Sequence, residues 1–206
     1  MARVSKRIKL NNVRISYAKL VEPGDTFDGS GKEYSCQVVM PKTHAQYQEL
    51  IDCRNSILLD AFPKATKAQK MSMKTLVRDA DEEGKSEEQS YLLGCVFFNA
   101  KRRESFGPVP VFDRRAAPMV PTNDTIYSGM IANVMLTLYS FDNQQSKGVA
   151  CGIDGLQVVD NQTAERWDNR TDVSSAFDAL DPDDVKNPRS APVTADVEEG
   201  DDDIPW

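Results

Sequence analysis

Residues 126–141, IYSGMIANVMLTLYSF, form the longest strand candidate in this chain of 206 residues. It is apolar over most of its length, and the stretch Leu138–Asn143 at its end alternates, which is typical of a strand. The turn-forming residues 142–146 follow. Residues 148–159 are then expected to pair with residues 126–141, with a break at Asp154-Gly155. The second half of the chain therefore predicts a long β-hairpin.

Three more strand candidates precede this hairpin. In the first, residues 8–17, the alternation changes phase at Asn11-Asn12, which predicts a β-bulge. A Gly- and Asp-rich loop then leads to a second strand, in which four residues share one face: Tyr34, Cys36, Val38 and Met40. Residues 91–100 form the third candidate, and residues 101–121 are expected to be loops and short edge strands because they include four prolines.

One helical insertion separates the second strand from the third. A candidate capping box lies at Thr43–Gln46, and an apolar stripe then runs from Tyr47 to Ala61 and ends at Phe62-Pro63. A second, basic helix is predicted over 66–78, and the acidic stretch 79–90 is predicted to be mobile. This order predicts a mainly β domain, an OB-fold-like five-stranded Greek-key barrel with a helical insertion, although other β topologies fit the same spacing.

Charge divides the chain into two parts. Residues 1–180 hold 23 Lys/Arg and 23 Asp/Glu, whereas residues 181–206 hold 2 Lys/Arg and 9 Asp/Glu, so the whole net charge of −7 lies in the second part. That part also has four prolines and little apolar surface to bury, which predicts a disordered tail. We therefore expect a globular domain over 1–180 and an acidic tail over 181–206. The net charge of the tail does not describe the charge of the domain.

Neither a cofactor nor a metal is predicted, and an enzyme is not expected. The four cysteines are widely spaced and the chain has one histidine, which fits buried free thiols better than a zinc site or a disulfide scaffold. No phosphate-binding loop and no catalytic triad is recognisable, and the acidic cluster Asp79–Glu83 is the one alternative, a nuclease-like Mg²⁺ site. We expect neither a signal peptide nor a membrane-spanning segment, and hence a cytoplasmic protein.

Basic and aromatic residues occur together in two stretches, 97–106 and 112–115. A protein that binds single-stranded nucleic acid needs cations along the phosphate backbone and flat side chains on which bases stack. The competing interpretation is that the aromatics fill the barrel, and of Phe97 and Phe98 one is expected to point inward and the other outward. The six bases between Arg3 and Lys19 also fit a flexible solubilising arm. The predicted DNA-binding residues are Lys101, Arg102, Arg103, Phe106, Phe112, Arg114, Arg115, Phe98 and Tyr34.

The body resembles a family of phage proteins once labelled only as of unknown function. The similarity rests on Val13–Ala18, Asn99–Lys101, Tyr127–Gly129, Leu138–Asn143 and Lys147–Ile153. That family is related to the OB-fold single-stranded-DNA-binding proteins of phage replisomes. The resemblance implies sequence-nonspecific binding to single-stranded DNA during replication and recombination in the bacterial host cytoplasm, and a homodimer.

The tail resembles the tip of bacterial single-stranded-DNA-binding proteins, which end on an acidic run, Ile-Pro and an aromatic residue, usually Phe. The residues predicted to bind a partner are Asp201, Asp202, Asp203, Ile204, Pro205 and Trp206. The resemblance implies that the tip recruits a replication or recombination protein, such as a polymerase, helicase, recombinase or nuclease. The acidic tail is also expected to compete with DNA for the basic groove of its own body. A single-strand annealing recombinase and an adaptor whose barrel binds protein are the alternatives.

Overall fold

The computed structural model describes residues 3–143 and 145–167. The predicted tail, residues 181–206, and the predicted domain boundary at residue 180 lie outside these ranges. No helix among the described residues is long and apolar enough to cross a membrane.

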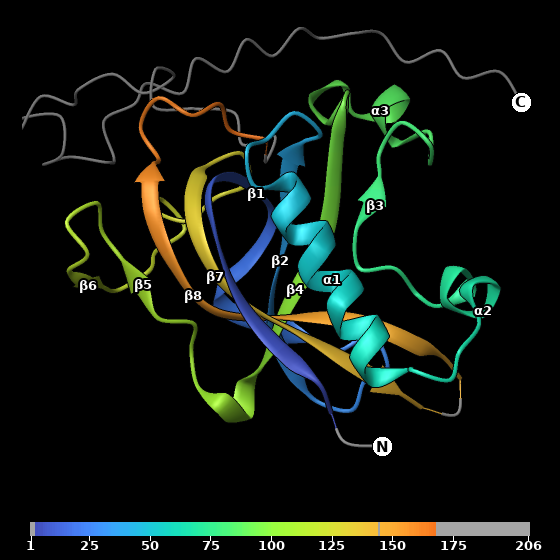
Figure 1. Ribbon diagram of the computed structural model, residues 1–206. Helices are drawn as coiled ribbons and strands as arrows, with labels where there is room; N and C mark the ends of the chain where they lie inside the picture. Colours follow the sequence, from blue (N-terminus) through green and yellow to red (C-terminus); the bar gives the residue numbers. More distant parts are fainter. Residues whose placement is uncertain (1–2, 144, 168–206) are drawn as a thin grey trace, which may run out of the picture. The chain divides into compact units, whose positions relative to one another are not determined.

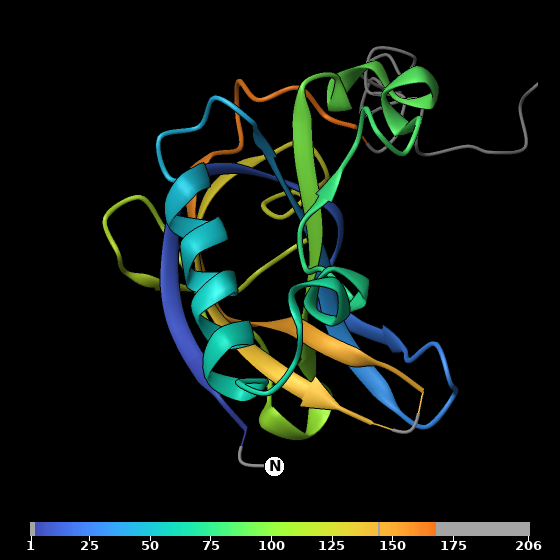
Figure 2. The same ribbon diagram turned by 45° about the vertical axis from the view of Figure 1, so that its right-hand side comes forward.

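Five strands form a closed barrel (Figures 1 and 2). They are β1 (Ser5–Asp25), β2 (Lys32–Pro41), β4 (Cys95–Arg103), β7 (Ile131–Asp142) and β8 (Lys147–Asp160). Antiparallel pairing gives the order β4-β2-β1-β7-β8, and a parallel contact of Lys101 on β4 with Gly152 on β8 closes the ring. The prediction of a mainly β, OB-like five-stranded barrel is therefore confirmed, and its helical insertion lies between β2 and β4.

Strand β1 bends sharply because it contains more than one irregularity. Its register with β7 shifts between Leu10 and Val13, where Asn12 has a φ of 53°, so the predicted bulge is confirmed. Its register with β2 shifts again after Ser16, where Tyr17 has a φ of 47°. This second irregularity was not predicted. It turns the Tyr17 ring out to solvent, although Tyr17 follows Val13 and Ile15 in the apolar alternation of the sequence. The strand extends to Asp25, eight residues beyond the predicted end.

The barrel interior is the main hydrophobic core. The predicted inner face of β2 is confirmed, since Tyr34, Cys36, Val38 and Met40 are all buried. Helix α1 (Tyr47–Ala61) packs on the barrel through Leu50, Ile57, Leu58 and Ala61. Burial of each of the three leucine and isoleucine side chains stabilises the fold by about 1.5–3 kcal/mol.

The predicted capping box of α1 is wrong. Gln46 is the N-cap residue, and no side chain caps the helix. The Gln46 side chain instead accepts a hydrogen bond from the Asn11 amide (2.8 Å) and donates one to the Lys9 carbonyl (2.9 Å). It therefore satisfies backbone groups at the β1 bulge, where the ladder with β7 is interrupted.

Helix α2 (Lys67–Ser72) is much shorter than predicted. Thr66 and Gln69 form a capping box at its start, but beyond it the chain becomes extended and Lys74 pairs with Gly148 at the start of β8. This pairing requires a glycine, because a Cβ atom at position 148 would lie 2.3 Å from the Lys74 carbonyl oxygen.

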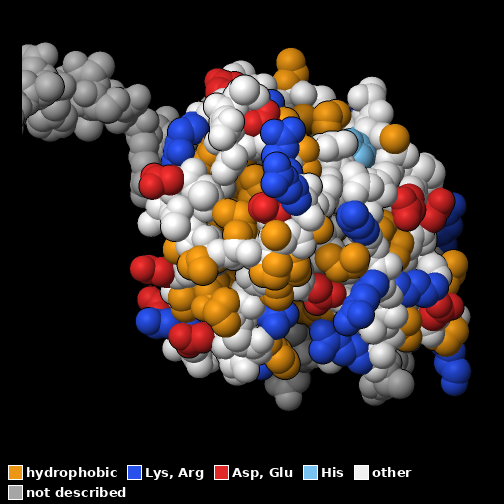
Figure 3. Space-filling view, turned by 90° about the vertical axis from the view of Figure 1, so that its left-hand side faces the viewer, with side chains coloured by type: hydrophobic (Ala, Val, Ile, Leu, Met, Phe, Trp, Pro, Cys, Tyr) orange, Lys and Arg blue, Asp and Glu red, His pale blue; other side chains and the backbone are white. Residues whose placement is uncertain are grey.

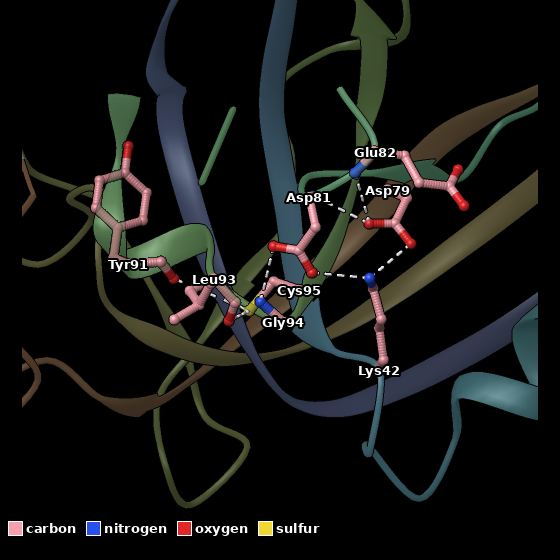
Figure 4. A network of polar contacts seen from close by, with 8 residues as sticks. All are labelled: Lys42, Asp79, Asp81, Glu82, Tyr91, Leu93, Gly94 and Cys95. Carbon is pink, nitrogen blue, oxygen red and sulfur yellow. Dashed lines mark hydrogen bonds and ion pairs between the residues drawn. The ribbon is translucent and has the colours of Figure 1, made fainter. Parts of the chain in front are cut away.

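The acidic stretch predicted to be mobile is folded. It contains β3 (Arg78–Asp79), α3 (Lys85–Glu88) and the 3-10 turn η1 (Ser90–Leu92), and we call residues 78–93 the outer cap. The Lys42 ammonium lies 2.7 Å from Asp79 and 2.8 Å from Asp81, and the Asp81 carboxylate also accepts a hydrogen bond from the Gly94 amide (Figure 4). Hydrogen bonds from Lys42 lower the pKa of both carboxyl groups.

The outer cap covers a second, smaller core on the outside of β2 and β4. Its buried residues are Val39, Ala80, Leu92, Cys95 and Phe97. Trp167 packs against this core and stacks on Tyr91, with ring centroids 4.0 Å apart. The sheet is therefore buried on both faces here, which the alternation of a half-buried strand does not predict.

The remaining elements lie between β4 and β7. They are the 3-10 turn η2 (Glu104–Phe106), β5 (Val111–Phe112) and β6 (Pro118–Met119). Strand β5 runs parallel to the second half of β8 and forms a small hairpin with β6. All four cysteines are free thiols, as predicted; three of them are buried, whereas Cys53 is half-buried, contrary to the prediction. Burial raises the pKa of the Cys36 thiol to about 12.

Candidate nucleic-acid interface

A groove of about 670 Å³ crosses the outside of the barrel where β4 meets β8. We call it the seam groove. One wall is the extended segment 73–78 that leads from α2 to β3, and the floor consists of the outward side chains of β4, β8 and β7. The side chains that matter for its chemistry are Lys74, Arg78, Asn99, Lys101, Tyr139 and Phe141.

The floor is flat because small residues lie beside the aromatic ones. Tyr139 pairs with Ala150 and Phe141 with Gly148, so their rings emerge beside residues that have almost no side chain. A Cβ atom at position 152 would touch the Tyr139 ring at 3.9 Å, which places that ring across Gly152. Both rings are half-buried, which fixes their positions and leaves part of each surface accessible.

One face of the Tyr139 ring is already in contact with a cation. The Arg3 guanidinium lies 3.7 Å from the ring centroid. Such contacts contribute about 0.5–1 kcal/mol at exposed sites. A flat group that is to stack on this face of Tyr139 must displace the guanidinium, which then lies beside the groove and is available to an anion.

Three cations line the groove, and two of them have carboxylate partners. Lys101 lies 2.5 Å from Glu33, and Arg78 pairs with Glu83 while its guanidinium covers the Phe97 ring at 4.7 Å. Lys74 is exposed and has no carboxylate partner within the described ranges. The Lys101 side chain keeps 46% of its surface exposed beside the largely buried Glu33, so a phosphate can reach its ammonium from the solvent side.

Two turns lie at the same end of the barrel, near the end of the seam groove. The β1–β2 turn carries Phe27, whose ring is fully exposed, and it lies beside the β7–β8 turn (Figure 2). In OB-folds, these two connections and the face of the second and third strands bind oligonucleotides and oligosaccharides. In this barrel the second and third strands are β2 and β4.

Two of the predicted DNA-binding residues are buried. Phe98 has no exposed surface and lies in the main core, and Tyr34 is 7% exposed in the same core. Neither ring can stack on a base, so these two predictions are wrong. The expectation that one of Phe97 and Phe98 points inward and the other outward is confirmed, but the outer cap buries the outward ring of Phe97, so it is not accessible to a base either.

The three bases of the cluster 101–106 belong to strand β4, not to a loop. Lys101 lines the seam groove, whereas Arg102 points back and donates hydrogen bonds to the carbonyls of Gly107 (2.9 Å) and Phe106 (2.6 Å). Arg102 therefore supports the η2 turn, which presents the Phe106 ring with 69% of its surface exposed. Arg103 is exposed at the end of β4.

Phe112, Arg114 and Arg115 lie apart from this cluster, on the β5–β6 hairpin. Phe112 is half-buried against Gly155, and both arginines are exposed. Arg114 lines a different hollow of about 480 Å³ that is otherwise rich in amides, including Asn133 and Gln157. Basic, acidic and hydrophobic side chains are intermixed on the face that carries this hairpin (Figure 3). The bases of 101–115 therefore do not form one patch, contrary to the sequence interpretation.

The N-terminal bases are not a flexible arm. Five of the six, from Lys6 to Lys19, belong to strand β1. Lys6 pairs with Asp60 at 3.4 Å, Arg7 with Asp154 at 3.5 Å, and Arg14 donates to the Gly129 carbonyl at 2.9 Å.

Sequence reasoning gave too little weight to four groove residues: Lys74, Arg78, Tyr139 and Phe141. Tyr139 and Phe141 are not among the residues predicted to bind DNA, because they lie on a strand, away from the basic cluster in sequence. One signal was available. In the alternation of β7 they fall on the face opposite to Leu136 and Leu138, which are buried.

The acidic cluster 79–83 is not arranged as an open metal site. The Lys42 ammonium occupies the position between the carboxylates of Asp79 and Asp81 (Figure 4). Within residues 3–143 and 145–167, no group of three or more His, Cys, Asp or Glu side chains is placed to hold a metal ion.

Comparisons with known proteins identify a phage family. Residues 6–186 match the family model described as "Enterobacter phage Enc34, ssDNA-binding protein". A putative protein p50 of Acyrthosiphon pisum secondary endosymbiont phage 1 is 25% identical over 154 residues, which cover 73% of this chain and 82% of that protein.

Solved structures share the fold. The single-stranded DNA-binding protein of bacteriophage Enc34, in complex with ssDNA, superposes with a TM-score of 0.62 at 22% identity over 78% of this chain and 89% of that one. For gp2.5, a single-stranded DNA-binding protein encoded by bacteriophage T7, the TM-score is 0.58 at 13% identity, over 86% of this chain and 98% of that one.

Proposed function

The chain belongs to the family of the single-stranded-DNA-binding protein of Enterobacter phage Enc34, and we propose that it coats exposed single strands during phage DNA replication and recombination through its seam groove. Membership supports the coarse function, a phage single-stranded-DNA-binding protein. The observation that carries the finer assignment is the groove itself, where two aromatic rings and three cations converge on one face of the barrel.

The groove residues suit a ligand that has both phosphates and exposed bases. Bases stack on Tyr139 and Phe141, and each stacked base contributes about 1–3 kcal/mol with little dependence on sequence. Phosphates contact the exposed side of Lys101 and contact Lys74. Duplex DNA cannot use the stacking surfaces, because its base faces are already stacked on one another. The arrangement therefore favours single strands over duplex without reading sequence.

A fluorescence titration with oligo-dT and with duplex DNA, at two salt concentrations, tests this function. We expect tight binding to oligo-dT that weakens as the salt concentration rises, and much weaker binding to duplex. Equal affinity for the two DNAs, or binding to oligo-dT that does not respond to salt, would contradict the proposal. Magnesium-dependent degradation of the oligonucleotide would show a nuclease instead of a non-enzymatic binding protein.

We also propose that the acidic tip, Asp201–Trp206, recruits replication or recombination enzymes. The support is chemical, since three carboxylates precede Ile204 and Trp206, and Trp is a frequent anchor in protein interfaces. Deletion of residues 198–206 is expected to abolish the capture of partners from phage-infected cells and to leave the fold of the body unchanged. Capture that survives the deletion would refute the role of the tip. The expected homodimer is tested separately by light scattering of the full chain.

A further inference from the structure

A second groove, of about 580 Å³, lies between α1 and α2, and we call it the helix groove. The side chains that matter for its chemistry come from both helices and from the segment that follows α2: Arg54, Leu58, Leu59, Lys67, Lys70 and Thr75. Thr75 also lines the seam groove, so the two grooves adjoin at this residue. A flexible polymer that leaves the seam groove past Thr75 can enter the helix groove directly.

The part of the chain that forms α2 is strongly basic. Residues 61–78 hold five Lys/Arg and no Asp or Glu. The two acids that flank this segment, Asp60 and Asp79, form ion pairs with Lys6 and Lys42, which belong to other parts of the fold. The positive charge of the segment is therefore not balanced by its neighbours in sequence.

Three lysines of this segment form a row that connects the two grooves. Lys67 and Lys70 are three residues apart on α2, so they lie on the same face of the helix, and both line the helix groove. Lys74 follows them and lines the seam groove. In the part of the chain that the structure describes, none of the three forms an ion pair with a carboxylate. We call Lys67, Lys70 and Lys74 the lysine track.

A fourth cation lines the helix groove from the side of α1. The Arg54 guanidinium is half-buried and donates a hydrogen bond to the neutral side-chain oxygen of Asn55 at 2.8 Å. The loss of hydration lowers the pKa of this guanidinium. A cation that has lost part of its hydration and has no anion beside it is stabilised when an anion binds. The helix groove is therefore suited to an anionic ligand.

The lining of the helix groove suits phosphates and sugars rather than stacked bases. Among the described residues that line it there is no aromatic ring, in contrast to the seam groove. Its apolar part consists of Leu58 and Leu59, and Leu59 is 58% exposed. Apolar side chains make favourable contacts with the C5 methyl group of thymine. The groove can thus hold a nucleic-acid backbone without stacking its bases.

The seam groove by itself is short for a single strand. Its two accessible rings, Tyr139 and Phe141, account for two stacked bases. One OB-fold binds about 4–16 nucleotides, so a strand that is held by these rings continues over adjoining surface. The lysine track offers it a row of phosphate partners that begins inside the seam groove.

We propose that single-stranded DNA leaves the seam groove past Thr75 and continues along the lysine track into the helix groove, where Lys67, Lys70 and Arg54 bind its phosphates. This inference deepens the proposed DNA-binding function and rests on it. It adds the helical insertion to the β2–β4 face and the two turns, which are the parts through which OB-folds bind oligonucleotides. The binding site then has two parts, one that stacks bases and one that binds phosphates, and a short strand fills the first part alone.

Titrations with oligo-dT of two lengths test this two-part site. The short oligonucleotide has about 4 nucleotides and the long one about 16, which are the limits for one OB-fold. The double variant Lys67→Ala/Lys70→Ala removes two cations, and alanine preserves the helix. With the long oligonucleotide, the slope of log K against log salt concentration should fall by about 0.7 for each lost phosphate contact, or about 1.4 in all. This corresponds to about 25-fold weaker binding at about 0.1 M salt, if phosphate contacts contribute nothing at about 1 M. With the short oligonucleotide, neither the slope nor the affinity should change.

A matched double variant shows whether position or charge alone is responsible. Lys9→Ala/Lys64→Ala removes the same charge from two exposed lysines that line neither groove, and Lys64 lies only three residues before Lys67. This control is expected to bind both oligonucleotides as the original chain does. Circular dichroism checks that both double variants are folded. An equal loss in the two double variants would mean unspecific attraction and would refute the lysine track.

Acetylation of lysines in the full chain, mapped by mass spectrometry, locates the contact directly. The long oligo-dT should protect Lys67 and Lys70 from the reagent, the short one should leave both reactive, and Lys64 should react in either case. If the long oligonucleotide leaves Lys67 and Lys70 reactive, or if the short one protects them equally, the proposed path is wrong. Stronger protection by duplex DNA than by the long oligo-dT would assign the helix groove to duplex and would also overturn the proposal.

The same titrations separate this inference from the proposed function. If the original chain binds neither oligonucleotide, the DNA-binding function fails, and the lysine track fails with it. If the original chain binds both and Lys67→Ala/Lys70→Ala binds the long one equally well, the seam groove keeps its function and the lysine track alone is refuted.

Discussion

Replacement of Tyr139 by leucine removes a stacking surface from the seam groove and keeps an apolar side chain on the strand. A stacked base contributes about 1–3 kcal/mol. A base that stacks on the face of the ring that Arg3 covers must first displace the guanidinium, at a cost of about 0.5–1 kcal/mol. The net loss expected for Tyr139→Leu is therefore about 1 kcal/mol, within limits of about 0 and 2.5 kcal/mol, which corresponds to an affinity that is roughly 5-fold and at most about 60-fold weaker at about 1.4 kcal/mol for each factor of ten.

Fluorescence anisotropy of a labelled oligo-dT measures this loss. Tyr17→Leu is the matched control, because Tyr17 is an exposed tyrosine on β1 that does not line the seam groove. Thermal unfolding of both variants shows whether the barrel is intact. If Tyr139→Leu binds oligo-dT as tightly as Tyr17→Leu does, while both are folded, Tyr139 does not stack on bases and the seam groove loses its main support.

Three further predictions follow from single contacts. Lys101→Ala is expected to weaken oligo-dT binding and to reduce the slope of log K against log salt concentration by about 0.7. This is the value for one phosphate contact on a single strand. An unchanged slope would mean that Lys101 does not contact the DNA. Gly148→Ala forces a Cβ atom against the Lys74 carbonyl, so urea denaturation should show a loss of about 1–3 kcal/mol, and unchanged stability would mean that segment 73–78 does not pack there. The pKa values of Asp79 and Asp81 are lowered by Lys42, so their contribution to stability is complete above the unfolded value of about 4 and is lost as the pH falls through the lowered values. The measurement uses Trp167 fluorescence in a Trp206→Phe background. On acidification, the outer cap should loosen at a higher pH in Lys42→Ala than in the protein that keeps Lys42. Equal midpoints of the two acid transitions would contradict this interpretation.

The barrel was predictable because its strands are long and alternate clearly. The change of phase at Asn11-Asn12 marked the bulge, and residues 34–40 gave the correct buried face. The outer cap was not predictable in the same way. Its acidic sequence is typical of a solvated loop. The folded structure depends on Lys42, which is distant in sequence and lies between Asp79 and Asp81.

The candidate site was less predictable than the fold, for a geometric reason. Residues 101–115 are close in sequence, but β4 directs Arg102 back into the η2 turn and the β5–β6 hairpin carries Arg114 to another hollow. The seam groove is assembled instead from four separate segments, namely 73–78, β4, β7 and β8, which meet where β4 closes on β8. Proximity in sequence is a poor guide to a site of this kind, because the closure of the barrel decides which residues meet. The face on which Tyr139 and Phe141 lie was readable from alternation, but their position beside Lys101 was not.

Ultraviolet cross-linking of an oligo-dT that carries 5-iodouracil, followed by mass spectrometry of the full chain, locates the bound bases on the protein. If single strands lie in the seam groove, the cross-links fall on Tyr139 and Phe141. Cross-links confined to Phe106, Phe112 and the β5–β6 hairpin would place the DNA on a different face and contradict the assignment of the groove.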